Sequence, residues 1–423
     1  MRLTIISYGT RGDVQPFLCL AWALKERGHD VRLVGPKNVE KWVAPTNIAF
    51  SPLPVDVQAL FAAEAAQKML AKGNIAAFFN WLSHEEKAYM HDMRQVIIEA
   101  TKDSDAIITH ALMEDRAAAI GVARKIPVLP VYFFPLVPSS GFASPFITTR
   151  NLSILNRFTH KMMLSMLWKF SKQETNEMRK ELGIAPSKIS FTNQVQQKNI
   201  PCILAYSENI FPRPKDYSDN NFVTGAFWMP ESLRQKLGES GISSNLTQWL
   251  ENGSAPIFLG FGSMPVLDVN SMLDMTRKAL KKVGARAVIG AGWSAVPVGG
   301  DETLFAIAHA DHEKLFARCI GAVHHGGSGT TYASLRAGLP TFICAVFADQ
   351  PFWGNRCRAL KVGDTIAFSK LNIDNLVLGL KHILSTEIRE NAKELGRRIA
   401  MEDGLAKAVN IIENHLPNAP LPD

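Results

Sequence analysis

The residues best suited to chemistry are a histidine pair followed by a glycine-rich turn, at 324–331 (HHGGSGTT). Apolar residues before them predict a buried strand over 321–324, and those after them predict a helix over 329–337. Glycines let a ligand approach the backbone, and the N–H groups that begin a helix attract anions. This junction therefore indicates a phosphate site, and a tight strand-to-helix turn without a ligand is the alternative.

A second polar group follows the next predicted strand, 341–346. Asp349 and Gln350 stand there, directly before a predicted helix over 350–360. In open α/β sheets ligands bind at the C-terminal ends of the strands, so we expect this pair near the same ligand. A helix N-cap is the alternative role for Asp349.

Four strings carry a family resemblance. Residues 324–331, 336–341 (RAGLPT) and 349–354 (DQPFWG) resemble the donor-binding signature of the two-domain GT-B glycosyltransferases, especially the bacterial and fungal sterol, lipid and antibiotic glucosyltransferases. Residues 9–16 (GTRGDVQP) resemble the N-terminal signature of that group. The similarity extends over nearly the whole chain, although about 55–200 carries no matching motif.

The resemblance implies an α/β fold of two Rossmann-like domains facing across a cleft. We expect an acceptor-binding domain over 1–213, a nucleotide-sugar donor domain over 214–400, and a helix over 401–423 that returns toward the first domain. The alternation of predicted strands and helices agrees with parallel sheets covered on both faces. Strands are predicted at 3–7, 30–35, 105–109, 127–131, 202–206, 256–260, 286–290, 321–324 and 341–346. Helices are predicted at 14–27, 85–101, 114–124, 268–283, 329–337, 350–360, 371–385 and 387–415. The proline-rich segment 211–216 reads as the linker.

The resemblance also assigns donor-binding residues. His325, rather than His324, would contact the diphosphate, and Asp349 and Gln350 would hydrogen-bond the sugar hydroxyls, which favours glucose. By the same resemblance, Ser263 lies in a donor-side loop and Trp293 lies beside the uracil of the nucleotide. His312 takes the place of the histidine in a family Pro-His-x-x-Leu-Phe string, in which Asp311 stands where the proline is usual. The complete donor set is Arg11, Gly12, Ser263, Trp293, His312, His325, Gly327, Ser328, Gly329, Thr330, Asp349 and Gln350.

No metal is expected at the site, and no cofactor beyond the nucleotide-sugar co-substrate. Asp103 and Asp105 form an Asp-x-Asp pair like the metal ligands of the other glycosyltransferase fold. They precede the strand over 105–109, so we expect them at the opposite sheet edge from the ligand. Charge on the leaving diphosphate would instead be met by His325, the helix N-terminus at 328–330 and Arg11.

Asp13 is the expected catalytic base, because the resembling enzymes place their proposed base at this aspartate. The reserve candidate is His110, after the strand over 105–109, and capping of the helix over 14–27 is the alternative role for Asp13. The predicted reaction is inverting transfer of a hexose to a hydroxyl of an apolar acceptor such as a sterol, terpenoid, lipid, polyketide or phenolic. The expected sugar is glucose, and the expected donor is UDP-glucose, with dTDP-glucose as the second choice. A nucleotide-sugar epimerase of the same fold and an inactive nucleotide-sugar-binding protein are the alternatives. An NAD-dependent oxidoreductase lacks support, since its glycine fingerprint is missing after the first strand.

Composition bears on the number of domains, the cellular compartment and the kinds of partner that the protein can bind. The 423 residues suit two cores, and five widely spaced cysteines indicate a reducing compartment. We expect a cytoplasmic protein, because no signal peptide or long apolar run is evident. The net charge of +7 comes without the clustered basic and aromatic residues of nucleic-acid binders.

The segment 150–182 combines apolar residues at helical spacing with basic ones. Its apolar members are Leu152, Leu155, Phe158, Met162, Met166 and Phe170, and its basic members are Arg150, Arg157, Lys161, Lys169 and Lys172. Three roles remain open at this point: a helix packed on its own domain, a wall of the acceptor site, or peripheral contact with a membrane.

Overall fold

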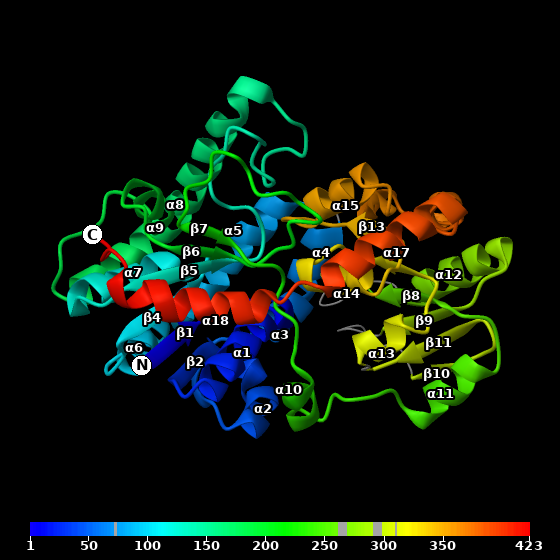
Figure 1. Ribbon diagram of the computed structural model, residues 1–423, viewed down its shortest axis with the longest axis horizontal. Helices are drawn as coiled ribbons and strands as arrows, with labels where there is room; N and C mark the ends of the chain where they lie inside the picture. Colours follow the sequence, from blue (N-terminus) through cyan, green and yellow to red (C-terminus); the bar gives the residue numbers. More distant parts are fainter. Residues whose placement is uncertain (72–73, 261–268, 291–297, 309–310) are drawn as a thin grey trace. The chain divides into compact units, whose positions relative to one another are not determined.

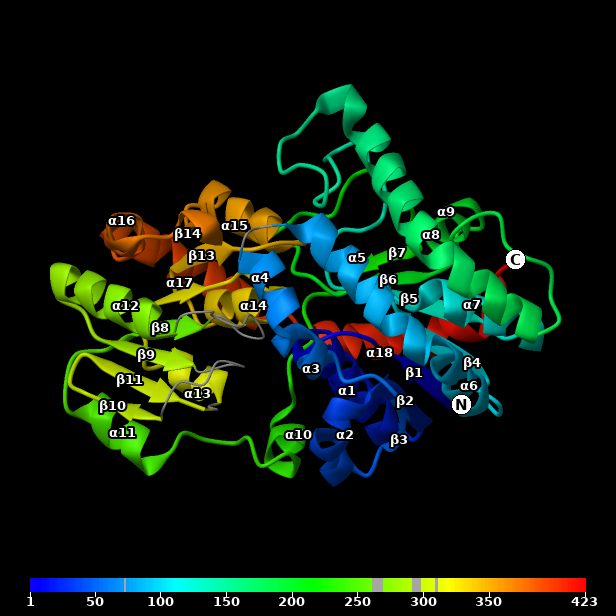
Figure 2. The same cartoon turned by 180° about the vertical axis from the view of Figure 1, so that it is seen from behind.

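A computed structural model describes residues 1–71, 74–260, 269–290, 298–308 and 311–423 (Figures 1 and 2). The chain forms two compact units. The first consists of Met1–Val57, Glu85–Leu237 and Asp403–Asp423, and the second consists of Gln58–His84 and Gly238–Glu402. Within the described residues, each unit is built around one seven-stranded sheet.

The first sheet is parallel, with the strand order β3-β2-β1-β4-β5-β6-β7. Its strands are β1 (Arg2–Ile6), β2 (Asp30–Pro36), β3 (Ala49–Leu53), β4 (Ala106–His110), β5 (Val128–Tyr132), β6 (Cys202–Leu204) and β7 (Asn221–Val223). Every residue of β4 and β5 is buried, as expected for central strands of a parallel sheet with helices on both faces.

The helices of the first unit cover this sheet. They are α1 (Arg11–Glu26), α2 (Glu40–Val43), α6 (Met90–Ala100), α7 (Glu114–Arg124), α8 (Asn156–Glu181), α9 (Phe191–Gln197), α10 (Glu231–Lys236) and α18 (Gly404–His415), with 3-10 turns at Lys37–Val39, Ala44–Thr46, Lys87–Tyr89, Ser153–Leu155 and Leu416–Asn418. Helix α18 packs beside α1, and Ala408, Val409 and Ile412 join its core. Gly404 begins α18 so close to the backbone that an added Cβ would meet the Gly225 carbonyl oxygen at 2.4 Å.

The second sheet has the order β10-β11-β9-β8-β12-β13-β14, and only the short β10 runs antiparallel among the described strands. Its strands are β8 (Ile257–Gly260), β9 (Ala287–Gly290), β10 (Gly299–Gly300), β11 (Leu304–Ile307), β12 (Gly321–His324), β13 (Thr341–Ala345) and β14 (Gly363–Ala367). Its helices are α11 (Ser244–Glu251), α12 (Val269–Val283), α13 (His312–Phe316), α14 (Ser328–Arg336), α15 (Gln350–Ala359), α16 (Ile373–Ile383) and α17 (Thr386–Ala400), and a 3-10 turn lies at Phe368–Lys370. Residues 58–84 also belong to this unit, and they contain most of the helices α3 (Val57–Ala62), α4 (Glu64–Ala71) and α5 (Ile75–Glu86).

The predicted strands and helices are all present, with ends shifted by a few residues. The sequence analysis missed the strands β3, β7, β10, β11 and β14. It also placed the linker wrongly: the proline-rich segment 211–216 is followed by β7, which pairs with β6 in the first sheet. The first unit continues to Leu237, so the boundary between 213 and 214 is replaced by one between 237 and 238. Prolines mark a loop, but they do not show whether the chain returns to the same sheet afterwards.

Residues 403–423 are part of the first unit. Among the described residues, no helix has both the length and the apolar run that crossing a bilayer requires.

Candidate active site at two strand-order switch points

Each sheet has one point at which the strand order reverses direction. In the first sheet it lies between β1 and β4, and in the second it lies between β8 and β12. The crevice outside the carboxyl ends of such strand pairs is where open α/β sheets bind ligands. Asp13 follows β1 and His110 ends β4, while His325 follows β12. Sheet topology thus places the predicted base and the predicted phosphate contact at corresponding points of the two units.

In the second unit, the start of α14 is open to an anion. Gly327 is its N-cap residue, with φ −57° and ψ 141°, and the first intrahelical bond runs from the Thr331 N–H to the Gly327 carbonyl at 3.0 Å. The backbone N–H groups of residues 328–330 therefore have no partner within the helix. No other described residue accepts a hydrogen bond from them, which leaves three aligned donors for an anion.

Glycines shape this opening. Gly326 has φ +91°, and an added Cβ would lie 2.5 Å from a methyl carbon of Ile343. A Cβ on Gly327 would meet Nε2 of His325 at 2.5 Å. Gly329 faces open space instead, with no atom within 4 Å of an added Cβ. The first two glycines are needed for the turn, whereas Gly329 leaves room in front of the helix.

The two histidines have different roles. His324 is fully buried, and its Nδ1 accepts a hydrogen bond from the Gly326 N–H at 3.0 Å, so it holds the turn. His325 is partly buried, and no described residue bonds its buried Nδ1. Burial lowers the pKa of His325 to about 4, opposed by the Gly260 backbone. At neutral pH His325 can therefore offer an anion a hydrogen bond but no positive charge.

Asp349 and Gln350 lie at the start of α15, after β13. The Asp349 side chain does not cap the helix; its Oδ2 accepts a hydrogen bond from the indole N–H of Trp353 at 2.7 Å. Gln350 is buried, and its Oε1 accepts from the N–H groups of Val346 and Phe347 at 2.8 and 3.2 Å. The side-chain oxygen of Gln350 is therefore used to hold the loop before α15. Its amide N–H₂ group is the part that is suited to binding a ligand.

The remaining second-unit predictions fall outside or beside this opening. Ser263 and Trp293 lie outside the described residues. His312 begins α13, is exposed, and stacks on Phe316 with ring centroids 4.9 Å apart and an interplanar angle of 7°. Asp311, which replaces the family proline, is the N-cap of α13 and accepts from the N–H groups of Glu313 and Lys314.

In the first unit, Asp13 and His110 come together. Nε2 of His110 lies 3.8 Å from Oδ1 of Asp13. Phe17 meets the His110 ring edge-on and Phe133 stacks with it, both at 5.9 Å between centroids, so the ring is held in place. Burial lowers the pKa of His110, although the nearby Asp13 opposes this. The Asp13 side chain is 36% exposed and that of His110 only 7%, so Asp13 is the more accessible base.

Asp13 also closes the N-terminus of α1. Its Oδ2 accepts from the backbone N–H of Thr10 at 2.7 Å and from the Thr10 hydroxyl at 3.0 Å. The N-cap of α1 is Thr10 and Asp13 is the third helical residue, so Asp13 is not the N-cap that was the alternative for it, although it completes a capping box. Its second oxygen faces His110, so this bond leaves the role of base open. Gly9 has φ +129°, and an added Cβ would lie 2.3 Å from Asp13, so the tight approach depends on glycine.

Arg11 and Gly12 occupy the first turn of α1. The Arg11 guanidinium lies 4.7 Å from the centre of the Trp42 ring, and its Nε donates to Gln15 at 3.1 Å. Gly12 is exposed. Arg11 is thus held by its own unit.

Sequence reasoning missed two residues near this switch point. The hydroxyl of Tyr8, directly after β1, donates to Glu86 at the end of α5. Burial raises the pKa of Glu86, while this bond and the charge of Arg116 lower it. Tyr8 adjoins the recognised string at 9–16, but nothing in the sequence singled out Glu86. By contrast, Asp105 lies before β4 and binds Arg2, at the sheet edge where the sequence placed it.

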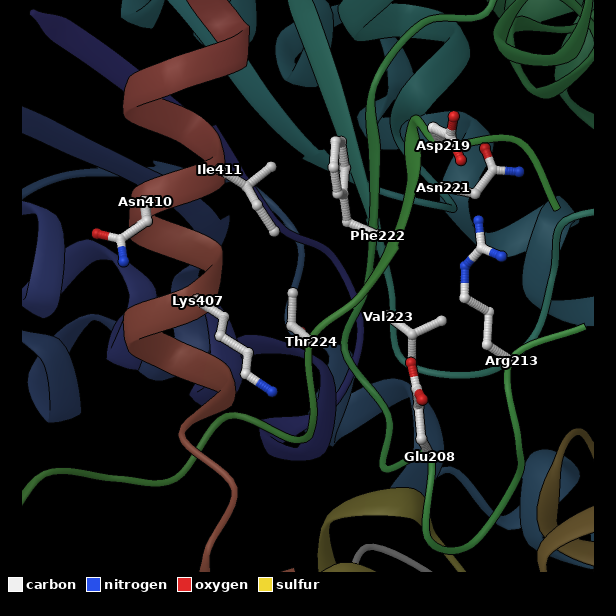
Figure 3. Close-up of a pocket in the computed structure, with 10 residues that line it drawn as sticks. All are labelled: Glu208, Arg213, Asp219, Asn221, Phe222, Val223, Thr224, Lys407, Asn410 and Ile411. Atoms are coloured by element: carbon white, nitrogen blue, oxygen red, sulfur yellow. The ribbon is translucent and has the colours of Figure 1, made fainter.

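An open surface pocket lies elsewhere in the first unit. It has a volume of about 510 Å³ and lies between the last strand, β7, and α18 (Figure 3). Figure 3 shows Lys407 and Asn410 of α18 on one side and Glu208 and Arg213 on the other. Because β7 is the edge strand, three strands from β4, this pocket is separate from the switch point.

Two family domains match this chain. Residues 3–120 match the glycosyltransferase family 28 N-terminal domain, and residues 306–413 match the C-terminal domain of the erythromycin biosynthesis protein CIII-like family. These matches contain Asp13 and His110 in the first case, and His325 and Asp349 in the second.

Sterol 3-beta-glucosyltransferases are similar along the whole chain. One from Arabidopsis thaliana is 29% identical over 99% of this chain, and one from Aspergillus clavatus is 29% identical over 99%. The chain spans 66% of the length of the plant protein and 30% of the fungal one.

Solved structures share the fold. The glycotransferase of kitacinnamycin matches with a TM-score of 0.70 and 15% identity, covering 98% of this chain and 99% of the other. The glycosyltransferase VinC in complex with dTDP matches with a TM-score of 0.65 and 15% identity, again covering 98% and 99%.

Proposed function

Because the chain belongs to the glycosyltransferases of the GT-B fold, we propose that it transfers glucose from UDP-glucose to a hydroxyl of an apolar acceptor, with inversion at the anomeric carbon and without a metal. The second unit binds the donor. The first unit supplies the base that activates the acceptor. The similarity to sterol 3-beta-glucosyltransferases supports a sterol or a related lipid as the acceptor.

The single observation that carries the donor assignment is the open start of α14. Three backbone N–H groups at 328–330 and the neutral ring of His325 offer hydrogen bonds without bringing a charged side chain. A diphosphate leaving group gains negative charge as its bond to the anomeric carbon breaks, and preorganised donors stabilise that charge. The helix dipole acts in the same direction.

The acceptor half of the reaction is assigned to Asp13. Its Oδ1 would take the proton of the acceptor hydroxyl as the acceptor oxygen bonds to the anomeric carbon and the diphosphate departs from the opposite face. His110 lies 3.8 Å from this oxygen and is fixed between two phenylalanines. We assign it the role of holding the carboxylate in position rather than that of base.

The sugar would be read by residues at the start of α15. Asp349 presents a carboxylate there, and the N–H₂ group of Gln350 can donate. Hydroxyls of an intact hexose would satisfy both, which favours glucose over deoxysugars. Since sterols reside in bilayers, the proposal includes peripheral contact of a cytoplasmic enzyme with a membrane.

The test is release of UDP in the presence of an acceptor panel of sterols, terpenoids, phenolics and macrolides, with UDP-glucose and dTDP-glucose as donors. We expect UDP to be released only when a sterol is present. We also expect the glucoside that forms to be β-linked. The Asp13→Asn variant is the control, since it should bind UDP as the parent does but turn over about 10²–10⁴-fold more slowly. Conversion of UDP-glucose to another sugar nucleotide without acceptor would replace the proposal by an epimerase, and donor binding without turnover on any acceptor would replace it by a binding protein.

A further inference from the structure

Exposed apolar side chains gather on one part of the first unit. They are Phe146, Leu152, Ile154, Leu155, Phe158, Met162, Met166, Leu167 and Phe170, on α8 and the chain before it. Ile154 is 93% exposed and Phe158 is 61% exposed. Elsewhere in the described chain such residues are scattered along the sequence, for example Val298, Leu378 and Met401. A concentration of exposed apolar side chains of this kind indicates an interaction site.

Helix α8 packs on its unit through a different face. Its buried residues are Asn156, Thr159, His160, Met163, Leu164, Thr175, Met178 and Arg179. Phe158, Met162, Met166 and Phe170 recur every fourth residue, so they form one stripe along the helix, here called the α8 stripe. The packed-helix interpretation of these residues is therefore wrong, because the residues that pack are their neighbours.

Charge accompanies the α8 stripe. The sequence contains no Asp or Glu between residues 117 and 173. The five basic residues Arg150, Arg157, Lys161, Lys169 and Lys172 are all exposed. Arg157 pairs with Asp216 at 3.1 Å, and none of the described residues pairs with Lys161, Lys169 or Lys172. The surface is thus apolar and cationic, which is complementary to anionic lipid headgroups above an acyl layer.

We propose that the α8 stripe and the residues 146–155 before it dock the enzyme on an anionic lipid bilayer. The apolar side chains would enter the headgroup boundary, while the lysines would remain at the phosphates. The end of α8 that carries this surface extends away from the first sheet in both views (Figures 1 and 2), as insertion requires. A second copy of the chain is a poorer occupant, because it would bring two cationic faces together.

The proposal stands on this surface and does not depend on glucose transfer. Binding is measured by co-sedimentation of the full chain with vesicles of phosphatidylcholine alone, or mixed with phosphatidylserine, without donor, acceptor or sterol. We expect strong binding to the mixed vesicles, weak binding to the neutral ones, and loss of binding as salt is raised. Each lysine near such a surface contributes about fivefold, so Lys161→Gln with Lys169→Gln should lower partitioning roughly twentyfold.

Two control pairs make the result specific. Phe158→Ser with Met162→Ser should lower partitioning at least about tenfold. Leu378→Ser with Met401→Ser, at residues of the second unit that are even more exposed, should leave it unchanged. Lys381→Gln with Lys393→Gln is the control for charge. All four double variants should keep the melting temperature of the parent. They should also turn over an acceptor dispersed in detergent at the parent rate.

Three outcomes would overturn the proposal. The first is failure of the parent protein to bind the mixed vesicles, and the second is an equal loss in stripe and control variants. The third is a dimer in sedimentation velocity that the stripe variants dissociate. A raised KM for dispersed acceptor in the stripe variants, with vesicle binding intact, would instead make the surface an acceptor wall.

Discussion

The starts of α1 and α14 both follow a strand at a switch point, α1 after β1 and α14 after β12, which lie on opposite sides of their switch points, and they are finished differently. At α1 a carboxylate from the first turn accepts the Thr10 N–H. At α14 the cap is a glycine without a side chain, and the N–H groups of 328–330 receive no described partner. A helix start already holding an aspartate repels a second anion, while an open one attracts it. The same topology thus yields a place for a neutral hydroxyl in one unit and for a diphosphate in the other.

The largest effect should come from removing the charge at α1. Asp13→Asn keeps an amide oxygen that can accept from the Thr10 N–H, but it cannot take a proton. We expect turnover to fall by about 10²–10⁴-fold. Steady-state kinetics measures this, with UDP affinity and melting temperature as controls that should not move. Turnover within threefold of the parent would show that Asp13 is not the base and would make His110 the candidate. The difference between the starts of α1 and α14 would then have no catalytic meaning.

The next effect concerns the open helix start. His325→Ala removes a neutral donor to a charged ligand and should weaken UDP binding by about 1.5–3 kcal/mol, while EDTA should have no effect. Isothermal titration is the measurement, and His382→Ala on α16 is the matched control. If UDP binds equally to the alanine variant, or if chelation abolishes activity and magnesium restores it, α14 is not the diphosphate site.

A smaller effect separates sugar from nucleotide. In Asp349→Asn the amide oxygen can still accept from the Trp353 indole, so the fold should persist, but the second carboxylate oxygen is replaced by a donor. We expect UDP-glucose to lose about 1 kcal/mol, roughly fivefold in affinity, and bare UDP to lose nothing. Competition titrations with both ligands decide the matter. Equal losses would assign Asp349 to the fold or to the nucleotide.

The smallest effect is a difference in pH dependence between the units. In each unit, burial shifts the pKa of a titratable group in favour of its neutral form; one group, Glu114, is an acid and the other, His325, is a base. In the first unit burial raises the pKa of Glu114, which accepts hydrogen bonds from Tyr132 and Thr192, to about 8. The unfolded chain releases this proton from about pH 4.5 and the folded chain keeps it, so the contribution to stability falls as pH rises to 8. The pKa of His325 is about 4 in the folded chain and 6.5 in the unfolded chain, so the unfolded chain binds the proton first. The contribution of His325 to stability is therefore lost as pH falls from 6.5 to 4.

Substitution by glutamine tests these opposite signs. Relative to the parent, Glu114→Gln should gain a few °C in melting temperature at pH 8, and His325→Gln should gain a few °C at pH 4, each with little change at the other pH. Scanning calorimetry across pH 4–8 is the measurement. Gains of the same sign at both ends would show that burial does not set these two pKa values.

How far the sequence predicts this molecule depends on whether the cause is local. The β12–α14 junction was predicted to within a residue, because its glycines and apolar run determine the turn by themselves. The proximity of Asp13 and His110 depends on the pairing of β1 with β4, which no local pattern encodes.

Local patterns failed where distant contacts decide. The prolines at 212 and 214 indicated a linker, yet β7 returns to the first sheet because its partner, β6, lies there. On α8 the periodic apolar residues left a packing face as one of three open roles, whereas in the structure Met163 and Leu164 pack and Phe158 and Met162 face solvent. Both faces contain apolar residues at helical spacing, so periodicity alone could not select between them.

Helix α18 has a consequence for how the protein is made. The first unit needs Leu405, Ala408, Val409 and Ile412 to finish the core beside α1, and Asp423 binds Gln194 and Arg179. A ribosome would synthesise the strands of the first sheet early and this helix only after the entire second unit. The second unit can therefore fold while the chain is still growing, whereas the first must wait with part of its core uncovered. The half whose strands emerge first is the half that needs a chaperone longest.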